Sequence, residues 1–268
     1  MLFNNIVLIS DLDGTLLDDA KKISDKNMSA IGEFIDNGGI FTIATGRGVA
    51  STRDVAEELQ LAAPAVVFNG AAVYLFSEKH FLWQCSLSDS APDYVSMITA
   101  RFPTIGVEIL RGEDVYVTQS NRREERRFAS IVKTPIWRPL GDIPPDGWLK
   151  VLYVDEPETI DELIVFGAEH CGDDVHLVRS ESIYCEMLPG GVNKGAGLDK
   201  LLEIIEADGR YIVATGDYDN DVEMLEYADL GIAVANATPS AMAAADMVVG
   251  DNNSDVIWEI VEYLKKSQ

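Results

Sequence analysis

The feature of this sequence that most limits its fold is the alternation of short apolar runs with helical patterns at both ends of the chain. The runs are apolar throughout, which is typical of strands buried on both faces of a parallel sheet. Between them, apolar residues recur at helical spacing, as at Met28, Ile31 and Ile35. The pattern predicts an α/β fold with helices on both faces of a parallel sheet. The predicted strands are 6–10, 40–44, 65–68, 211–215, 230–234 and 247–249, and the predicted helices are 24–37, 49–59, 194–206, 221–228 and 254–265.

The middle of the chain has a different organisation. Strand-like and helix-like segments are mixed there, and proline and glycine cluster in 138–147. Because the flanking segments resemble two halves of one sheet, we predict a core of residues 1–82 and 189–268 into which an α+β domain, 83–188, is inserted. The strands predicted in the insert are 107–110, 115–118, 149–154, 175–178 and 184–187, and the helices are 93–102, 122–131 and 159–171.

Composition argues against several classes of function. The net charge of −24, from 45 acidic and 21 basic residues, repels nucleic acid and anionic membranes, so neither is an expected partner. Apolar runs are shorter than the roughly 18 residues of a membrane span, and Asp11 and Asp13 interrupt the N-terminal run before it resembles a secretory signal. Three scattered cysteines suit neither a disulfide framework nor a zinc site. We expect a cytoplasmic protein, monomeric or weakly dimeric.

Polar clusters follow the predicted strands at the points where these strands end. Open parallel sheets bind ligands beyond the carboxyl ends of their strands, so these clusters are expected to meet. They are "DLDGT" at 11–15, "TGR" at 45–47, Asn69 with Gly70, and "GDYDND" at 216–221, and a fifth cluster, "GGVNKG" at 190–195, opens a predicted helix.

The first cluster favours a metal ion. The strand period of two aims Asp11 and Asp13 to the same side, where two carboxylates repel unless one holds a proton or a cation lies beside them. Further carboxylates at Asp217 and Asp221 favour the cation, and an oxygen-only set with few ligands suits Mg²⁺. The alternative is an ordinary turn, for which Asp, Gly and Thr are also common.

The cluster at 190–195 favours an anion. Lys194 lies near a helix start, where backbone N–H groups and the helix dipole attract negative charge. Taken singly, Thr45, Arg47 and Asn69 are also common as capping, ion-pairing or turn residues, so their shared position is what favours a site. A calcium-binding EF-hand loop starting at Asp217 does not fit, because the glycine and glutamate that it requires are absent.

These motifs together resemble the haloacid dehalogenase (HAD) superfamily. "DLDGT", "TGR", the lysine before a helix and "GDxxND" stand in its order and spacing, and the insert resembles the class IIB cap of its Cof-type phosphatases. The resemblance covers the whole chain. It implies a Rossmann-like HAD core, a cap that carries substrate specificity, and a Mg²⁺-dependent phosphatase for small phosphomonoesters such as sugar phosphates or related metabolites.

The resemblance also implies a role for each motif residue. Asp11 would be the nucleophile that forms an aspartyl-phosphate, and Asp13 the general acid and base. Mg²⁺ would be held by Asp11, the backbone carbonyl of Asp13 and Asp217, with Asp221 in the second shell or bound through water. The residues implied to bind the phosphoryl group or to neighbour it are Thr45, Gly46, Arg47, Asn69, Lys194 and Asn220.

Two other functions remain open. A phosphomutase with a similar cap, like phosphomannomutase, uses the same pair of aspartates but returns the phosphoryl group to a reoriented substrate. A non-catalytic, receiver-like phospho-acceptor domain is disfavoured by Asp13 and Lys194, because an adjacent acid–base group hastens loss of the phosphate.

Overall fold

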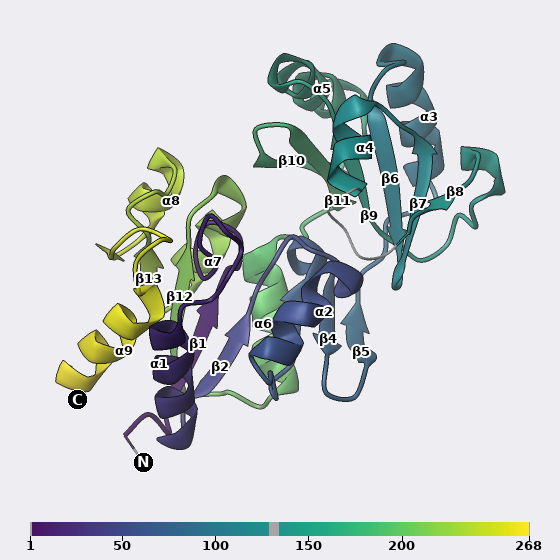
Figure 1. The fold of residues 1–268 in the computed structure, drawn as a ribbon. Coiled ribbons are helices and arrows are strands. Elements are labelled where there is room, and N and C mark those ends of the chain that lie inside the picture. Colours follow the sequence, from purple (N-terminus) through teal and green to yellow (C-terminus); the bar gives the residue numbers. More distant parts are fainter. Residues whose placement is uncertain (1, 129–133, 268) are drawn as a thin grey trace.

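The computed structural model describes residues 2–128 and 134–267. Its core is a sheet of parallel strands in the order β14-β13-β12-β1-β2. Figure 1 labels β13, β12, β1 and β2 of this sheet. The strands are β1 (Ile6–Ser10), β2 (Ile40–Ile43), β12 (Tyr211–Gly216), β13 (Leu230–Ala233) and β14 (Met247–Val248). Because β1 and β12 are neighbours, with Ser10 paired to Thr215, the residues that follow them emerge side by side. The predicted parallel sheet is confirmed.

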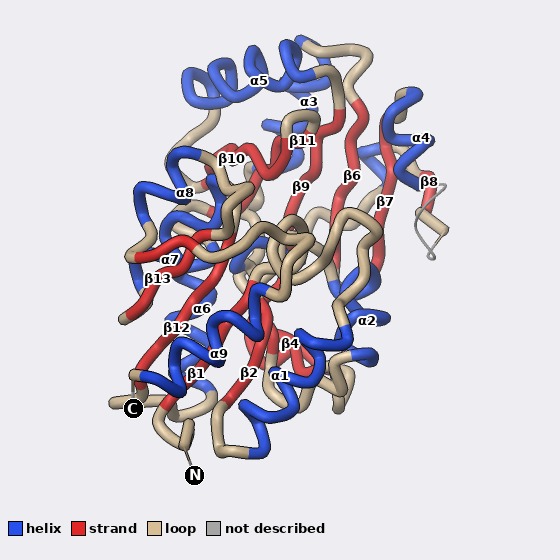
Figure 2. The backbone as a smooth tube through the Cα atoms, turned by 60° about the vertical axis from the view of Figure 1, so that its left-hand side comes forward, coloured by secondary structure: helices blue, strands red, loops and turns tan. Residues whose placement is uncertain are grey.

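Helices cover both faces of this sheet, as predicted. The pair α1 (Asp25–Asp36) and α9 (Val256–Lys266) packs on one face, and α6 (Lys194–Ile204) with α7 (Val222–Tyr227) packs on the other (Figures 1 and 2). Helix α2 (Val49–Glu58) follows β2, and α8 (Pro239–Ala244) is a short helix that we did not predict. Throughout the described ranges, every helix is too short or too polar to cross a bilayer.

The third predicted strand lies outside the core sheet. Strand β3 (Ala65–Val67) pairs antiparallel with β4 (Ala72–Leu75), which pairs with β5 (His80–Gln84). A parallel bridge from Ala44 to Val66 still joins β3 to the end of β2. We did not predict the β4–β5 hairpin because its turn lacks the usual Gly or Asn, and Lys79 takes the left-handed backbone there, with φ of 57°.

The insert forms a second, mostly antiparallel sheet with helices, so the α+β prediction is confirmed. Its strand order is β10-β11-β9-β6-β7-β8. The strands are β6 (Gly106–Arg111), β7 (Asp114–Gln119), β8 (Ile136–Trp137), β9 (Trp148–Val154), β10 (Val175–Glu181) and β11 (Tyr184–Pro189), and the helices are α3 (Ala91–Arg101), α4 (Arg122–Phe128) and α5 (Pro157–His170). Strand β8 was not predicted, because a strand of two residues is too short to show a pattern of apolar and polar positions. The end of the predicted 122–131 helix lies outside the described residues.

We call this second unit the cap. Its predicted limits, 83–188, stay a prediction: β5 crosses the first limit and β11 crosses the second. Two clusters of buried apolar side chains organise the molecule. One fills the core and includes Leu110, Leu152 and Val154 of the cap sheet, and the other lies inside the cap around Trp148 and Tyr153. One face of the cap sheet therefore packs toward the core, and the other faces the cap's own helices.

Candidate active site

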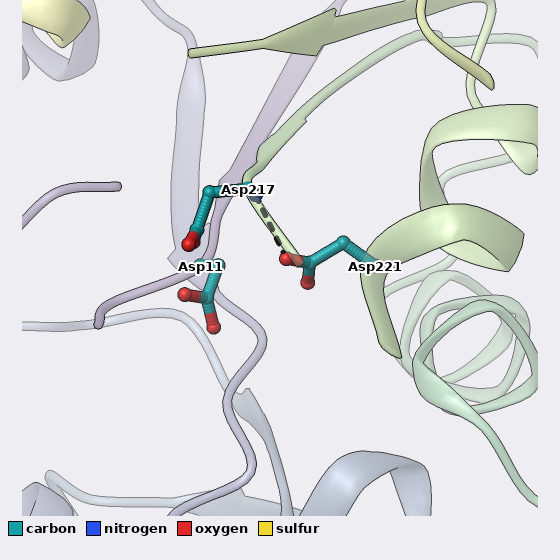
Figure 3. Close-up of side chains that lie close together, drawn as sticks. All are labelled: Asp11, Asp217 and Asp221. Carbon is teal, nitrogen blue, oxygen red and sulfur yellow. Dashed lines mark hydrogen bonds between the residues drawn. The ribbon is translucent and has the colours of Figure 1, made fainter. Parts of the chain in front are cut away.

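The site is built where two neighbouring core strands end. Asp11 comes directly after β1 and donates its backbone N–H to the carbonyl of Thr215 at 2.9 Å, and Asp217 comes directly after β12. A short 3₁₀ turn, η3 (Asp219–Asp221), then brings Asp221 back toward them. Carboxylate oxygens of Asp11, Asp217 and Asp221 all lie within 4.8 Å of one another, and the side chains are buried (Figure 3).

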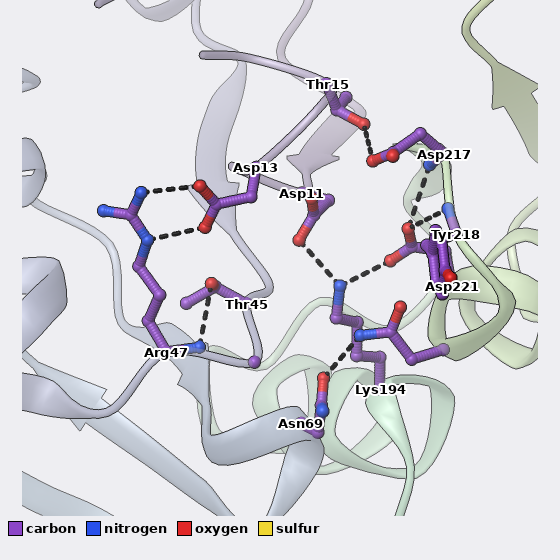
Figure 4. Close-up of polar contacts among 12 residues, drawn as sticks. Asp11, Asp13, Thr15, Thr45, Arg47, Asn69, Lys194, Asp217, Tyr218 and Asp221 are labelled. Carbon is purple, nitrogen blue, oxygen red and sulfur yellow. Dashed lines mark hydrogen bonds and ion pairs between the residues drawn. The ribbon is translucent and has the colours of Figure 1, made fainter. Parts of the chain in front are cut away.

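Lys194 joins this group from the first residue of α6. The helix starts there because Asn193 caps it, accepting the N–H of Ala196 at 2.8 Å. The lysine Nζ donates to Asp11 Oδ1 at 2.6 Å and to Asp221 Oδ1 at 2.5 Å (Figure 4). Burial alone would lower the pKa of Lys194, but the two carboxylates outweigh it and raise that pKa above its ordinary value. Lys194 is a fixed positive charge.

One lysine does not neutralise the carboxylates. Burial, together with the charges of the neighbouring aspartates, raises the pKa of Asp11 well above its ordinary value, against the opposing charge of Lys194. Burial and the charge of Asp221 likewise raise the pKa of Asp217 to about 7. The cluster therefore needs a proton or a further cation. Its oxygen-only donors fit a hard divalent ion such as Mg²⁺.

Asp221 and Thr15 hold Asp217 by hydrogen bonds, and Gly14 leaves room for it. Asp221 Oδ2 accepts the backbone N–H of Asp217 at 2.9 Å and that of Tyr218 at 3.0 Å. Gly14 has φ of +84°, and a Cβ placed on it would lie 2.4 Å from Asp217 Oδ2, so only glycine lets the chain pass here. Thr15 donates its hydroxyl to Asp217 Oδ1 at 2.8 Å.

The carboxylate of Asp13 has separate partners. It accepts from Arg47 Nε at 2.6 Å and Nη2 at 2.7 Å, and from Lys21 Nζ at 2.8 Å. Burial alone would raise the pKa of Asp13, but Arg47 and Lys21 outweigh it and hold that pKa at about 2. Asp13 lies outside the group of carboxylates around Asp11, so its part in binding a metal through the backbone carbonyl stays a prediction.

A cavity of about 790 Å³ opens between the core and the cap above these groups. The predicted residues that line it are Asp11, Asp13, Thr45, Gly46, Arg47, Lys194, Asp217 and Asn220. Asn69 and Asp221 lie behind that lining, where Asn69 Oδ1 accepts from Asn220 Nδ2 at 2.8 Å. The cap contributes Glu108, Leu110, Lys150, Leu152, Tyr184 and Glu186, among others. The structure thus brings every predicted site residue to one place.

Sequence reasoning missed several residues of the site. Thr15 and Lys21 lie within or close to the first motif, but nothing local says which carboxylate each will bind. Lys150 and Glu186 had a clear signal that we did not use: each is a charged residue inside an otherwise apolar strand of the cap. A charge in such a strand is buried, and a buried charge requires a partner.

Comparisons with known proteins agree with this arrangement. Residues 8–261 match the haloacid dehalogenase-like hydrolase family. The chain is 26% identical over 259 residues to the 5-amino-6-(5-phospho-D-ribitylamino)uracil phosphatase YcsE of Bacillus subtilis, with 94% of this chain and 93% of that protein covered. It is also 26% identical over 275 residues to the pyridoxal phosphate phosphatase YbhA of Escherichia coli, with 95% and 97% covered.

A solved structure shows the same fold. The HAD subclass IIB sugar phosphatase BT4131 superposes with a TM-score of 0.83 at 18% identity, covering 96% of this chain and 98% of that chain. The likeness extends over both the core and the cap. The chain therefore belongs to the haloacid dehalogenase-like hydrolases, as a phosphatase of that family, and it shares the fold of a member with a class IIB cap.

Proposed function

We propose that the protein is a Mg²⁺-dependent phosphatase that hydrolyses small phosphomonoesters, such as sugar phosphates or related metabolites, through an aspartyl-phosphate intermediate. The observation that carries this proposal is the convergence of Asp11, Asp217 and Asp221 around Lys194 at one cavity. The names of YcsE and YbhA, which specify small phosphorylated metabolites, support the substrate class.

Asp11 acts as the nucleophile on phosphorus, and Lys194 holds it in place and neutralises part of the negative charge that would repel the phosphate. Asp11, Asp217 and the backbone carbonyl of Asp13 would hold the metal, with Asp221 fixing Asp217 from behind. When bound, Mg²⁺ supplies charge neutralisation and orients phosphoryl oxygens. Thr45, Gly46 and Asn220 bind or neighbour those oxygens.

Asp13 moves the protons. It protonates the leaving alcohol and then removes a proton from the water that hydrolyses the intermediate. Its pairing with Arg47 and Lys21 keeps it ionised, which suits the second step. For the first step Asp13 has to take up a proton from solvent, which requires these cations to be drawn away from it, and the anionic phosphoryl group competes for them. Arg47 lines the same cavity and is placed to make that exchange.

The test is phosphate release from a panel of phosphorylated metabolites with Mg²⁺, with and without EDTA. We expect release to require Mg²⁺ and to fall by about a thousandfold or more in Asp11→Asn and Asp13→Asn. Unchanged release in these variants would rule out the proposed site. Analysis of the sugar phosphate products distinguishes hydrolysis from a mutase reaction, which isomerises the substrate without releasing inorganic phosphate.

A further inference from the structure

Two charged side chains of the cap are buried against the core. Lys150 lies on β9 and Glu186 on β11, and the strand period places Lys150 on the same face as Leu152, toward the core. Lys150 Nζ lies 2.9 Å from Glu186 Oε1, and the two side chains are 4% and 5% exposed. Burying an ion pair gives little net stability, so its placement here calls for another explanation.

Each member of this pair also binds a different core loop. Lys150 Nζ donates to the carbonyl oxygen of Gly46 at 2.5 Å, in the "TGR" loop. Glu186 Oε2 accepts from Asn69 Nδ2 at 2.6 Å. The other end of the Asn69 amide accepts from Asn220, the neighbour of Asp221 in sequence. A chain of polar contacts therefore runs from the cap sheet to the floor of the candidate site.

The backbone at Asn69 supports a positioning role. Phe68 and Asn69 both take the left-handed conformation, with φ of 54° and 53°. This conformation is costly for a bulky residue such as Phe68, although asparagine adopts it more readily, and it persists where surrounding contacts hold it. Asn69 is 1% exposed and is held on one side by Glu186 and on the other by Asn220. A Cβ on Gly46 would lie 3.1 Å from the Asn69 amide, so the two loops pack as one unit.

We infer that Lys150 and Glu186 are positioning residues through which the cap sets the geometry of the phosphoryl pocket. They hold Gly46 and Asn69 in place, and their contribution is the same whatever leaving group the substrate carries. This inference rests on the proposed function, because it takes the loops at Gly46 and Asn69 as the phosphoryl pocket. It differs from a specificity contact, which would favour some leaving groups over others.

The first test is the dissociation constant of inorganic phosphate, measured by calorimetry in the presence of Mg²⁺. Lys150→Met keeps an unbranched side chain that is only one atom shorter but removes the donor, and we expect it to raise this constant by roughly tenfold. Glu186→Gln keeps an oxygen that accepts from Asn69 but turns an amide NH2 toward Lys150 Nζ, so it should also raise the constant, by about threefold or more.

Arg53→Met is the matched control. Arg53 Nη2 pairs with Glu113 Oε2 at 2.6 Å, which also joins the core to the cap, but the two side chains are 40% and 38% exposed and their pairing does not involve Gly46 or Asn69. We expect it to change the phosphate dissociation constant by less than about twofold. Equal effects of Lys150→Met and Arg53→Met would overturn the inference, because loosening of the cap would then explain both.

The second test compares leaving groups. Lys150→Met should lower kcat/KM by the same factor for p-nitrophenyl phosphate and for pyridoxal phosphate. A loss confined to one substrate would instead assign Lys150 to leaving-group recognition and contradict the inference. If the wild type hydrolyses neither these two substrates nor any member of the metabolite panel, the proposed function fails. The phosphate dissociation constant needs no turnover and still tests the roles of Lys150 and Glu186.

Folding of the single variant is controlled by a double one. Lys150→Met leaves the Glu186 carboxylate buried without its cation, which can prevent folding. Lys150→Met with Glu186→Leu removes both charges, and we expect it to fold while still binding phosphate roughly tenfold more weakly than the wild type. Wild-type phosphate binding by the folded double variant would overturn the inference.

Discussion

Charged residues reach the cavity from the core and from the cap, and the two sets are held in different ways. Asp11 and Asp217 stand at strand ends and Lys194 at a helix start, where local backbone geometry places them. Lys150 and Glu186 stand inside strands, where the register of β9 against β11 places them. The comparison suggests that the core carries the reaction and the cap adjusts its geometry. Substitutions in the core should therefore abolish turnover, and those in the cap should weaken it.

After the loss expected for Asp11→Asn and Asp13→Asn, the largest effect is expected for Lys194→Met. The substitution leaves Asp11 and Asp221 without the ammonium group that bridges them at 2.6 and 2.5 Å. We expect kcat to fall by about a hundredfold to a thousandfold, as when one fixed charge-stabilising donor is removed from an active site. The measurement is steady-state phosphate release, with circular dichroism to verify the fold.

Lys200→Met is the control for that variant. Lys200 lies on the same helix, but it is partly exposed and pairs with Glu203 one turn along. We expect its kcat to stay within about twofold of the wild type, as for other exposed pairs. A similar loss of kcat in both lysine variants would mean that the loss comes from damage to helix α6 and not from removal of the ammonium group that bridges Asp11 and Asp221.

A smaller effect is expected for Thr15→Val, which removes the hydrogen bond to Asp217 but keeps the shape of the side chain. The Mg²⁺ concentration needed for half-maximal activity should rise by about tenfold to a hundredfold, because groups that orient metal ligands have effects of this size. Thr15→Ser keeps the hydroxyl and should stay close to the wild type. An unchanged Mg²⁺ requirement in Thr15→Val would contradict the proposal that Asp217 binds the metal.

A change of a few degrees in Tm is expected for Asp217→Asn. The pKa of Asp217 is about 7 in the folded protein against an ordinary value of 3.8, so the folded state holds a proton that the unfolded chain releases. The stability that this proton supplies is present at low pH and is lost as pH rises through about 7. Without Mg²⁺, Asp217→Asn should therefore raise Tm by a few degrees near pH 8 and by less near pH 5.5.

Thermal unfolding in EDTA at the two pH values checks this, and added Mg²⁺ gives the internal control. Near pH 8 the metal should stabilise the wild type more than Asp217→Asn, which lacks one carboxylate ligand. A variant that gains equal stability at both pH values would contradict the raised pKa of Asp217.

The smallest effect is expected at the rim of the cap. Glu113 pairs with Arg53 and accepts from the Tyr74 hydroxyl at 2.9 Å, but its side chain is 38% exposed. Exposed pairs contribute about 1 kcal/mol or less, so Glu113→Gln should leave kcat/KM within about twofold and Tm within a few degrees. A tenfold loss of activity would show that the rim also controls the site, and would weaken the distinction between rim and floor.

The same comparison explains how much the sequence could predict. Asp11, Asp217 and Lys194 were predictable because each follows directly from a local pattern, a strand or helix end next to a polar motif. Strand β1 was predicted with its observed limits, because the polar residues on either side of its apolar run mark where the buried strand begins and ends. Lys150 and Glu186 depend on which strands pair and in what register, and these are long-range properties that no short segment contains.

Other differences have the same physical origin. Strand β3 carries the expected apolar residues, but its main pairing is with β4, and that choice depends on a hairpin turn without a sequence signal. The partners of Asp13 were likewise not predictable, because Arg47 lies 34 positions away and Lys21 had ordinary polar surroundings. Sequence patterns located the site, whereas tertiary contacts decided which charges meet there.

The measurement that tests the central claim most directly is a crystal structure of the wild type grown with Mg²⁺ and inorganic phosphate. We predict one ion within about 2.1 Å of oxygens from both Asp11 and Asp217, with the phosphate beside it and within hydrogen-bonding distance of Lys194. An ion bound elsewhere, or a phosphate far from Lys194, would contradict the account.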